Sequence, residues 1–540
     1  MAGGTGSGSV IDLQQVRTVA NSLFQGHGSA LEKPRESAPG LTLEPLGPDA
    51  LAIAQDALAR VSFQQPDDPH PTLPWADTVP GAGAVSAKTS PSLIPDLIPD
   101  HLNPSMFVAM ANTLFPPSFI VGRSAESRPI AEAQPARRIE AARADFPALQ
   151  QAVHGKPLVW LDNAATTQKP RAVVERISRF YYEENSNVHR GAHLLAARAT
   201  DAYENARNQV ARFIGAASPQ EIVFTRGTTD AINLVAASFG RLRIGPGDEI
   251  ILGELEHHSN IVPWQMLAEQ QGARIRVAPV DDNGDLLLEQ YGALLNARTR
   301  LVAMSHVSNA IGTVFPIAQV IAMAHHAGAR VLIDGAQSVP HMAVNVQLLG
   351  CDFYCFSGHK LYGPTGIGVL FGRRELLDAM PPYQGGGSMI DSVTFEQSVY
   401  APVPAKFEAG TGILAGAVGL GAAVEYVQQL GLPLIERHEG ALMDRTLAGL
   451  SALPRIRVIG NPQHRAGAIS FIVDGMDVAT VGMLLDREGI AVRAGHHCAQ
   501  PALAHFGLKA TVRPSFALYN THADVDTLLA ALHRIVGARG

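Results

Sequence analysis

The chain has 540 residues, 46% of them hydrophobic, and a formal net charge of −7 at pH 7. This weakly acidic balance argues against a nucleic-acid-binding protein, and no apolar run approaches the roughly 20 residues of a transmembrane helix, so we expect no membrane partner. The three cysteines, Cys351, Cys355 and Cys498, are too few for a disulfide framework and fit a reducing cytoplasm. The N-terminus lacks the basic and apolar regions of a signal peptide, which also indicates a cytoplasmic protein.

Residues 1–134 differ in composition from the rest of the chain. They are rich in proline and carry 13 Asp and Glu against 7 Lys and Arg. Stretches such as 64–71 and 91–100 place prolines too closely for long helices or central strands. We therefore expect a mostly disordered extension with short ordered patches.

Two short segments of this extension, 91 positions apart, resemble each other. Residues 16–24 read VRTVANSLF and residues 107–115 read FVAMANTLF. In both copies the apolar residues recur at the spacing that places them on one face of a two-turn helix. Helices this short need a surface on which to bury that face. The two copies could pack on the body of the protein itself, or they could be paired docking motifs on a flexible tether.

From about Trp160, short β-rich segments alternate with helical patterns. The segments expected to form strands are 221–224, 249–252, 273–277, 300–304, 329–333, 351–356 and 366–371. The clearest helical pattern precedes them, with apolar residues at intervals of 4, 3, 4 and 3: Ala199, Tyr203, Ala206, Val210 and Phe213. Further helical patterns occupy 261–271 and 316–326. This alternation predicts an α/β fold with a mainly parallel sheet, in a large domain that spans residues 135–425.

After about residue 425 the pattern changes to helices with only a few strands. We expect residues 426–540 to form a smaller α+β domain, which carries Cys498.

Polar residues follow five of the expected strands. They are the Thr228–Thr229 pair, the His257–His258 pair, Asn309, Asp334 and the segment Ser357–Lys360. Ligands of such sheets bind beyond the carboxyl ends of the strands. A lysine, an acid, a ring that can stack and a phosphate cup at a helix N-terminus are what pyridoxal phosphate requires.

Lys360 is therefore the candidate Schiff-base lysine, and Asp334 is the candidate partner of the pyridinium nitrogen. Thr229, Ser357 and His359 could bind the phosphate, and His257 could stack on the ring. Each signal alone is weak, because such residues are common in ordinary loops and turns. Their joint placement at one edge of the sheet carries the prediction.

From about residue 136 to residue 540, the chain resembles the SufS-type, or group II, cysteine desulfurases, which are fold-type I pyridoxal-phosphate transferases. The motifs that carry the resemblance include LDNAATTQKP (161–170), NVHRGAH (187–193), RGTTDAIN (226–233), EHHSNIVPW (256–264), HVSNAIGT (306–313), DGAQ (334–337), FSGHKLYGPTG (356–366), FEAGT (407–411) and VRAGHHCAQP (492–501). They run in the family's order over about three quarters of the chain.

The resemblance implies a role for each matching residue. Lys360 binds the cofactor covalently, Asp334 pairs with its ring nitrogen, Gln337 with its ring oxygen, and His257 stacks over the ring. The phosphate is held by Thr228, Thr229, Ser357 and His359, together with Thr411 of the neighbouring subunit, which implies a homodimer. The substrate carboxylate is held by Asn309, Arg493 and Arg513. No metal is implied.

The implied reaction converts L-cysteine to L-alanine. Cys498 accepts the sulfur as a persulfide, which then passes to an acceptor protein or a small thiol. The neighbouring His496 and His497 could favour the reactive thiolate. Two positions depart from the family pattern. Ala494 replaces a threonine, and Pro514 stiffens the strand that carries Arg513.

Two alternatives remain open. The chain could be a selenocysteine lyase or another β-eliminating enzyme, which need not have an acceptor thiol. It could also be mainly a scaffold or a recruited cargo protein. The long proline-rich extension resembles those of desulfurases that are loaded into encapsulin shells. This resemblance implies that residues 1–134 bind an encapsulin shell protein and that the enzyme resides inside that nanocompartment.

Overall fold

The structure is a computed structural model that describes residues 139–189 and 193–537. The chain divides into two units, Met1–Asp96 and Leu97–Gly540, and every described residue belongs to the second. The expectations for residues 1–134, including the two similar segments, lie outside the described residues. Within the described ranges, no helix is long and apolar enough to cross a membrane. The same ranges contain no group of three or more His, Cys, Asp or Glu that could hold a metal ion.

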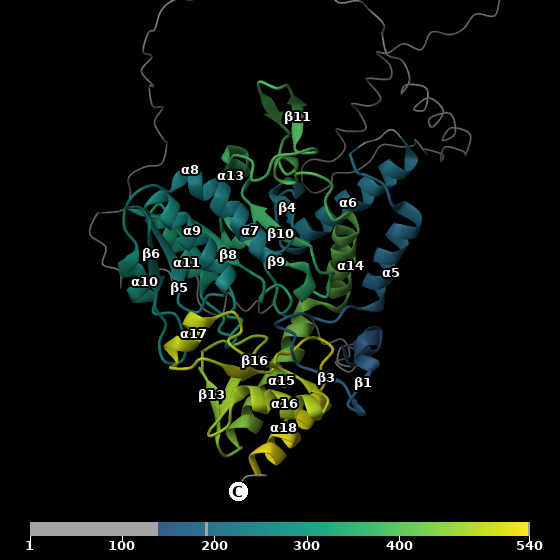
Figure 1. Ribbon diagram of the computed structural model, residues 1–540, viewed down its shortest axis with the longest axis vertical. Coiled ribbons are helices and arrows are strands. Elements are labelled where there is room, and N and C mark those ends of the chain that lie inside the picture. Colours follow the sequence, from purple (N-terminus) through teal and green to yellow (C-terminus); the bar gives the residue numbers. More distant parts are fainter. Residues whose placement is uncertain (1–138, 190–192, 538–540) are drawn as a thin grey trace, which may run out of the picture. The chain divides into compact units, whose positions relative to one another are not determined.

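A seven-stranded sheet forms the centre of the larger part (Figure 1). Its strands are β4 (Ile222–Thr225), β5 (Glu249–Gly253), β6 (Arg274–Ala278), β7 (Thr299–Ser305), β8 (Arg330–Asp334), β9 (Phe353–Ser357) and β10 (Gly368–Gly372). Their order is β4-β10-β9-β8-β7-β5-β6. The strands from β9 to β6 pair in parallel, whereas β10 is antiparallel to both β9 and β4. The predicted mainly parallel sheet is confirmed, with β10 as its one antiparallel member.

Helices cover both faces of this sheet, and the strands are accordingly apolar on both faces. In β8, Val331 and Ile333 face one core cluster and Leu332 faces the other. The first cluster includes α6 (Leu194–Phe213), α11 (Ile317–His326) and α14 (Leu414–Leu430). The second includes α7 (Thr228–Val235) and α9 (Val262–Gln271). All five apolar residues that mark the predicted helix in α6 are buried.

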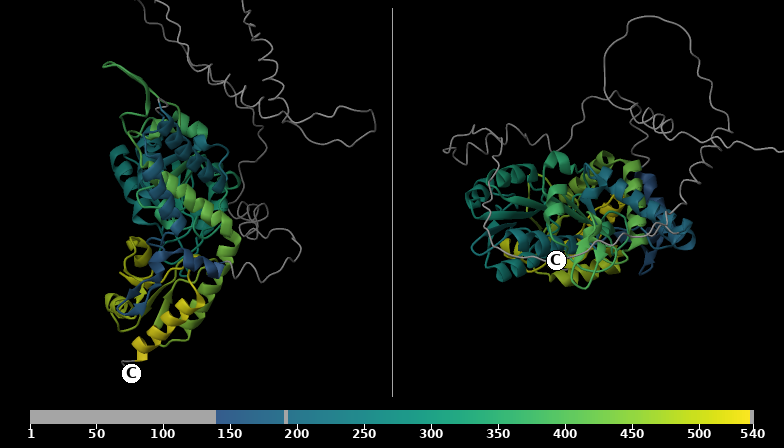
Figure 2. Two further views of the ribbon diagram at one scale, coloured as in Figure 1. Left: turned by 90° about the vertical axis from the view of Figure 1, so that its right-hand side faces the viewer. Right: turned by 90° about the horizontal axis from the view of Figure 1, so that it is seen from above.

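A second sheet of four antiparallel strands lies at one end of this part, and its colours run from green-yellow to yellow in Figure 2. In spatial order it contains β13 (Ile456–Ile459), β14 (Ser470–Val473), β17 (Thr511–Arg513) and β16 (Arg493–Gly495). Three helices pack against it around a separate core: α15 (Leu432–Ser451), α16 (Val478–Arg487) and α18 (His522–Gly537). A short strand from earlier in the chain, β3 (Val159–Trp160), pairs in parallel with β15 (Ile490–Ala491).

The remaining α-helices and β-strands are short or peripheral. They are β1 (Ala152–Val153), β2 (Lys156–Pro157), α5 (Arg171–Arg179), α8 (Arg241–Arg243), α10 (Leu288–Leu294), α12 (Val346–Leu349), α13 (Arg374–Ala379), β11 (Ile390–Val393), β12 (Ser398–Tyr400) and α17 (Gln500–His505).

Candidate active site

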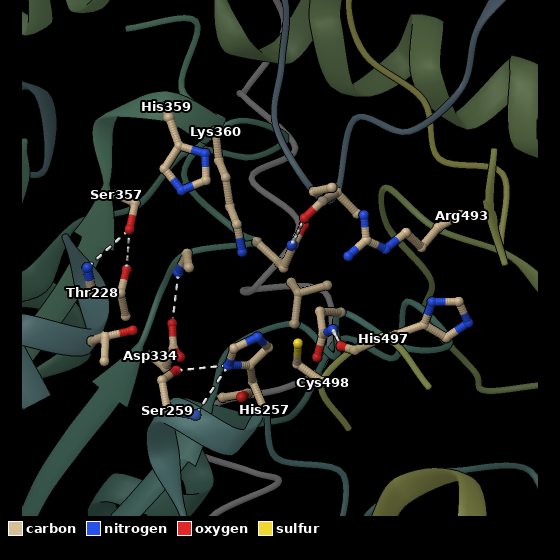
Figure 3. A pocket seen from close by; sticks show the side chains of 18 of the residues that line it. Thr228, His257, Ser259, Asp334, Ser357, His359, Lys360, Arg493, His497 and Cys498 are labelled. Atoms are coloured by element: carbon tan, nitrogen blue, oxygen red, sulfur yellow. Dashed lines mark hydrogen bonds between the residues drawn. The ribbon is translucent and has the colours of Figure 1, made fainter. Parts of the chain in front are cut away.

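A cavity of about 230 Å³ lies where the carboxyl ends of the large sheet meet the loop that carries Cys498 (Figure 3). Twelve of the predicted site residues line it: Thr228, Thr229, His257, Asn309, Asp334, Gln337, Ser357, His359, Lys360, Arg493, Cys498 and Arg513. Thr411 does not line this cavity, and its side chain is exposed. The structure therefore brings together residues that lie up to 285 positions apart in the sequence.

One end of the cavity is built at the N-terminus of α7. The first backbone N–H groups of a helix lack an intrahelical partner, and Gly227, which precedes this helix, has no side chain that could cap them. The Ser357 Oγ accepts from the Thr228 N–H at 2.9 Å and lies 2.8 Å from the Thr228 Oγ1. A Cβ on Gly368 would lie 2.4 Å from the Gly227 Cα, so β10 can approach this turn only with glycine there. Free N–H groups and hydroxyls at a helix N-terminus suit a phosphate.

Lys360 and Asp334 extend into the same space from neighbouring strand ends (Figure 3). Burial lowers the pKa of the Lys360 amine to about 8, although Asp334 opposes this change. Burial raises the pKa of Asp334, while the Ala336 N–H, at 2.9 Å from Oδ1, and Lys360 lower it. A buried carboxyl beside an amine of lowered pKa suits a charged heteroaromatic ring between them.

His257 forms another wall of the cavity. Its Nδ1 accepts from the Ser259 N–H at 3.1 Å and lies 2.8 Å from the Ser259 Oγ. Burial lowers the pKa of this imidazole to about 3, so the ring is neutral at physiological pH. With Nδ1 as an acceptor, Nε2 carries the proton. A neutral flat ring in this position can stack against an aromatic cofactor.

The residue before His257 is a buried acid, Glu256, which no sequence pattern singled out. Glu256 is fully buried, and its Oε1 accepts from the Ser305 N–H at 2.8 Å. Its Oε2 accepts from the Ser305 hydroxyl at 2.6 Å and from the Asn260 amide at 2.7 Å. Burial raises the pKa of Glu256 to about 7. This carboxyl therefore ties the end of β7 to the turn that carries His257.

A second group missed from the sequence fixes the loop of Lys360. The His359 carbonyl accepts from the Thr167 N–H at 3.1 Å, the Thr166 hydroxyl at 3.1 Å and the Thr167 hydroxyl at 3.2 Å. The Lys169 Nζ donates to the same oxygen at 2.9 Å. Burial lowers the pKa of Lys169 to about 8. Four donors thus hold the carbonyl of the residue that precedes Lys360.

Arg513 is buried, and its guanidinium reaches the cavity from β17. Its Nη1 donates to the Asn309 carbonyl at 2.7 Å, and its Nη2 donates to Asp162 Oδ1 at 3.4 Å. Among the described residues that line the cavity, three buried polar atoms have no hydrogen-bond partner: Arg513 Nε, Asn309 Oδ1 and His497 Nδ1. Arg493 is more exposed and lies 3.8 Å from Asp162. β17 ends at Arg513, so Pro514 lies just beyond the strand, and Arg513 still lines the cavity.

Cys498 is partly exposed, and Figure 3 shows its sulfur facing the cavity beside His257. Its N–H donates to His496 Nδ1 at 3.0 Å, and its carbonyl accepts from the His258 N–H at 2.8 Å. Both His497 and Cys498 have positive φ angles, 54° and 53°, which L-residues adopt rarely. Cys351 and Cys355 are buried, and burial raises the pKa of both thiols, so neither is a ready nucleophile.

Comparisons with known proteins identify the family and the fold of the chain. Residues 159–528 match the family model of class-V aminotransferases. Over 397 residues the chain is 58% identical to the cysteine desulfurase of Synechococcus elongatus, a match that covers 74% of this chain and 63% of that relative, less than two thirds of its length.

Two solved structures share the fold. The cysteine desulfurase CsdA (S-sulfonic acid) from Escherichia coli has a TM-score of 0.69 at 43% identity, over 75% of this chain and 99% of its own. A C-DES mutant with glycine covalently linked to its PLP cofactor has a TM-score of 0.62 at 25% identity. This match covers 72% of this chain and 98% of that structure's chain. The predicted fold-type I architecture is confirmed. The chain belongs to the class-V aminotransferase family, and it shares the fold of these two structures.

Proposed function

We propose that the chain is a cysteine desulfurase of the SufS type, which converts L-cysteine to L-alanine and keeps the sulfur on Cys498. The observation that carries this proposal is the placement of Cys498 and Lys360 in one cavity. Cys498 is the single cysteine of the three that lines it. The relatives named cysteine desulfurase support the same activity.

The positions of the side chains support the cofactor-binding roles. Lys360 would bind the cofactor, Asp334 would pair with its ring nitrogen, Gln337 with its ring oxygen, and His257 would stack on the ring. At the α7 end, the phosphate would be held by Thr228, Thr229, Ser357 and His359. When bound, pyridoxal phosphate withdraws electrons from the substrate and so weakens the bonds at Cα and Cβ.

The substrate carboxylate pairs with Arg513. A guanidinium fork suits a carboxylate, and the unpartnered Arg513 Nε is a buried donor in the cavity lining that such a carboxylate would satisfy. The Asn309 side chain orients the substrate, and Arg493, half exposed at the cavity mouth, adds positive charge. The lowered pKa of Lys360 lets its Nζ hold and release a proton near neutral pH.

Sulfur transfer then occurs at Cys498. Its thiolate forms an S–S bond with the substrate sulfur while the Cβ–S bond of the substrate breaks. The electron pair of the broken bond remains with carbon, which takes up a proton and becomes the methyl group of L-alanine. The products are L-alanine and a persulfide on Cys498, and an acceptor protein or small thiol then removes the outer sulfur.

The test is the production of alanine and sulfide from L-cysteine in the presence of a reductant. Lys360→Ala should lose the visible absorbance of the bound cofactor and all turnover. Cys498→Ser should retain that absorbance, but its turnover should fall by more than about a hundredfold. Cys351→Ala, a matched control away from the cavity, should retain its turnover. Normal turnover by Cys498→Ser would contradict the proposal and favour the selenocysteine lyase alternative.

We further propose a division of the chain into three parts: an extension (1–134), a cofactor-binding domain (135–425) and a small domain that carries Cys498 (426–540). The enzyme works as a homodimer, with Thr411 reaching the phosphate site of the partner subunit.

The extension docks the enzyme inside an encapsulin shell. Its proline-rich composition and its two similar segments support this role. Deletion of residues 1–134 should leave desulfurase activity intact and abolish co-sedimentation with a co-expressed shell protein. If the truncated enzyme were loaded into the shell as well as the full-length enzyme, the proposed docking role would be refuted.

A further inference from the structure

The loop that carries Cys498 has an unfavourable backbone conformation. His497 and Cys498 both have positive φ angles, 54° and 53°, and neither is a glycine. Residues keep such angles only where the surrounding structure holds them. Two hydrogen bonds to the backbone of the loop contribute. The His258 N–H donates to the Cys498 carbonyl at 2.8 Å, and the Asn309 side chain donates to the His497 carbonyl at 2.7 Å.

The side chain of His497 supplies a further anchor, through a chain of buried hydroxyl groups. Its Nε2 lies 2.7 Å from the Thr511 Oγ1. The Thr511 Oγ1 lies 2.9 Å from the Ser470 Oγ, and the Ser470 hydroxyl donates to the Ala310 carbonyl at 2.6 Å. Thr511 and Ser470 are fully buried, and His497 is 5% exposed. The chain of hydrogen bonds therefore links two strands of the small sheet, β17 and β14, to the segment that follows β7.

The hydrogen bonds of this chain can run in only one direction. A carbonyl only accepts, and a hydroxyl has one proton, so the Ser470 proton is committed to Ala310. Ser470 must then accept from Thr511, and Thr511, whose own proton is thereby committed, must accept from His497. The His497 ring therefore carries a proton on Nε2. Burial lowers the pKa of His497 to about 3, so the ring is neutral and its Nδ1 has no proton.

The strand β17 places the Thr511 side chain behind the cavity wall. Side chains two positions apart in a strand lie on the same face, so Thr511 shares its face with Arg513, which lines the cavity. Val512, between them, faces the core of the small sheet. Thr511 and Ser470 themselves do not line the cavity. We therefore expect any effect of these two hydroxyls on the reaction to pass through His497.

We propose that Thr511, supported by Ser470, is a positioning residue for Cys498, because it fixes the His497 ring and thereby keeps the neighbouring thiol facing the cavity. The proposal rests on the proposed role of Cys498 as the sulfur acceptor. Without the Thr511 hydroxyl, the buried His497 Nε2–H would lose its acceptor, which is unfavourable. The ring would then move toward water, and the loop would turn the thiol away from the substrate sulfur.

The rate of thiol alkylation measures the position of Cys498 without any turnover. Cys351 and Cys355 are buried, so iodoacetamide added to the folded holoenzyme reports on Cys498. Thr511→Val keeps the shape of the side chain and removes the hydroxyl. This variant should be alkylated about fivefold faster than the parent, the factor that corresponds to one ordinary hydrogen bond.

Two further variants separate positioning from a general loss of stability. Thr511→Ser keeps the hydroxyl and should restore the parent rate of alkylation. Thr446→Val is the matched control, because it removes an equally buried hydroxyl, which donates to the Leu442 carbonyl within α15. Its alkylation rate should equal that of the parent. A parent-like rate in Thr511→Val, or the same rise in Thr446→Val, would overturn the proposal.

Steady-state kinetics give a second measurement. Thr511→Val should retain the cofactor absorbance and lower kcat about tenfold, because a small displacement of a reacting group is costly. The KM for L-cysteine should change much less, since Thr511 does not line the cavity. An unchanged kcat would overturn the proposal. If the parent enzyme made no alanine from L-cysteine, the proposed function would fail, and the alkylation rates would still decide whether Thr511 positions Cys498.

Ser470→Ala provides an independent variant in case Thr511→Val does not fold. It breaks the chain one bond further from His497, so it should raise the alkylation rate of Cys498 by a smaller factor than Thr511→Val. A parent-like rate in Ser470→Ala would mean that the chain of hydroxyls does not hold the loop, and the proposal would be refuted.

Discussion

The His359 carbonyl is an unusual acceptor, because Thr166, Thr167 and Lys169 together direct four donors to one oxygen. The donors fix the peptide group that precedes Lys360, and none of the three donor residues lines the cavity. We therefore expect these residues to act on catalysis by positioning Lys360.

Lys169→Met should lower kcat about tenfold, because small displacements of a reacting group are costly. The KM for L-cysteine should change less than about twofold, since Lys169 does not touch the substrate. Lys169→Arg should recover part of kcat. The control is Lys156→Met, which removes an exposed ion pair with Glu488 and should have little effect. A raised KM with unchanged kcat would mean that Lys169 binds the substrate instead.

Glu256 predicts a pH dependence of stability. Its pKa is raised from 4.5 to about 7 in the folded protein, so between these values the folded state binds more protons than the unfolded state. The contribution of Glu256 to the free energy of unfolding is therefore largest at low pH and is lost as the pH rises toward 7. The loss is at most about 3 kcal/mol.

Thermal unfolding of the holoenzyme and of Glu256→Gln, compared from pH 5 to pH 8, measures this effect. Gln cannot ionise, so the advantage of the parent over the variant should be largest near pH 5 and should shrink toward pH 8. A difference in Tm that is constant over this range would mean that Glu256 does not titrate there.

At the scale of elements, the approach of β10 to the turn before α7 is the tightest constraint on the phosphate end of the cavity. A methyl group on Gly368 would meet the backbone of Gly227 at 2.4 Å, and backbone cannot move aside as a side chain can. Gly368→Ala should therefore destabilise the protein by about 1–3 kcal/mol and weaken retention of the cofactor.

The matched control is Gly440→Ala, in the interior of α15, where an added Cβ meets no atom within 4 Å. This change should stabilise the protein by about 0.5–1 kcal/mol and leave the cofactor bound. Urea unfolding and dialysis against cofactor-free buffer measure the two quantities. Equal stability of the two variants would contradict the steric argument.

The sequence was informative where local pattern and burial coincide. The apolar spacing in α6 and the short apolar runs of β7, β8 and β9 predicted elements that the structure contains. The antiparallel direction of β10 could not be predicted from its own residues, because the direction of a strand depends on its pairing with strands far away in the chain. Glu256 and Lys169 escaped detection for a similar reason. Their partners are backbone groups or short polar side chains brought close by folding, and no spacing rule encodes such contacts.

At the scale of the whole molecule, the segment around Thr411 is anchored in its own subunit. Glu408 accepts from Arg207 Nη1 at 2.6 Å, from the Tyr203 hydroxyl at 2.9 Å and from the Phe224 N–H at 2.8 Å. Thr411, three residues later, is exposed. An anchored base with an exposed end fits the proposed contact with a partner subunit.

Mixed dimers test this contact. A Lys360→Ala subunit paired with a Thr411→Ala subunit leaves one live site, which receives an intact Thr411 from the inactive partner, so that site should retain the cofactor normally. A subunit with both changes, paired with a parent subunit, leaves a live site that no longer receives a threonine hydroxyl from its partner and should release the cofactor faster. Equal release rates would place the action of Thr411 within its own subunit.

Residues 159–169 connect the two sheets as a strap. At one end β3 pairs with β15, and the Ala164 N–H donates to the Ser515 hydroxyl at 2.9 Å. At the other end Thr167 and Lys169 hold the His359 carbonyl. We therefore expect a rotation of the four-stranded sheet that widens the gap around Cys498 to displace the loop of Lys360 as well. The width of the cavity and the position of its lysine would then change together.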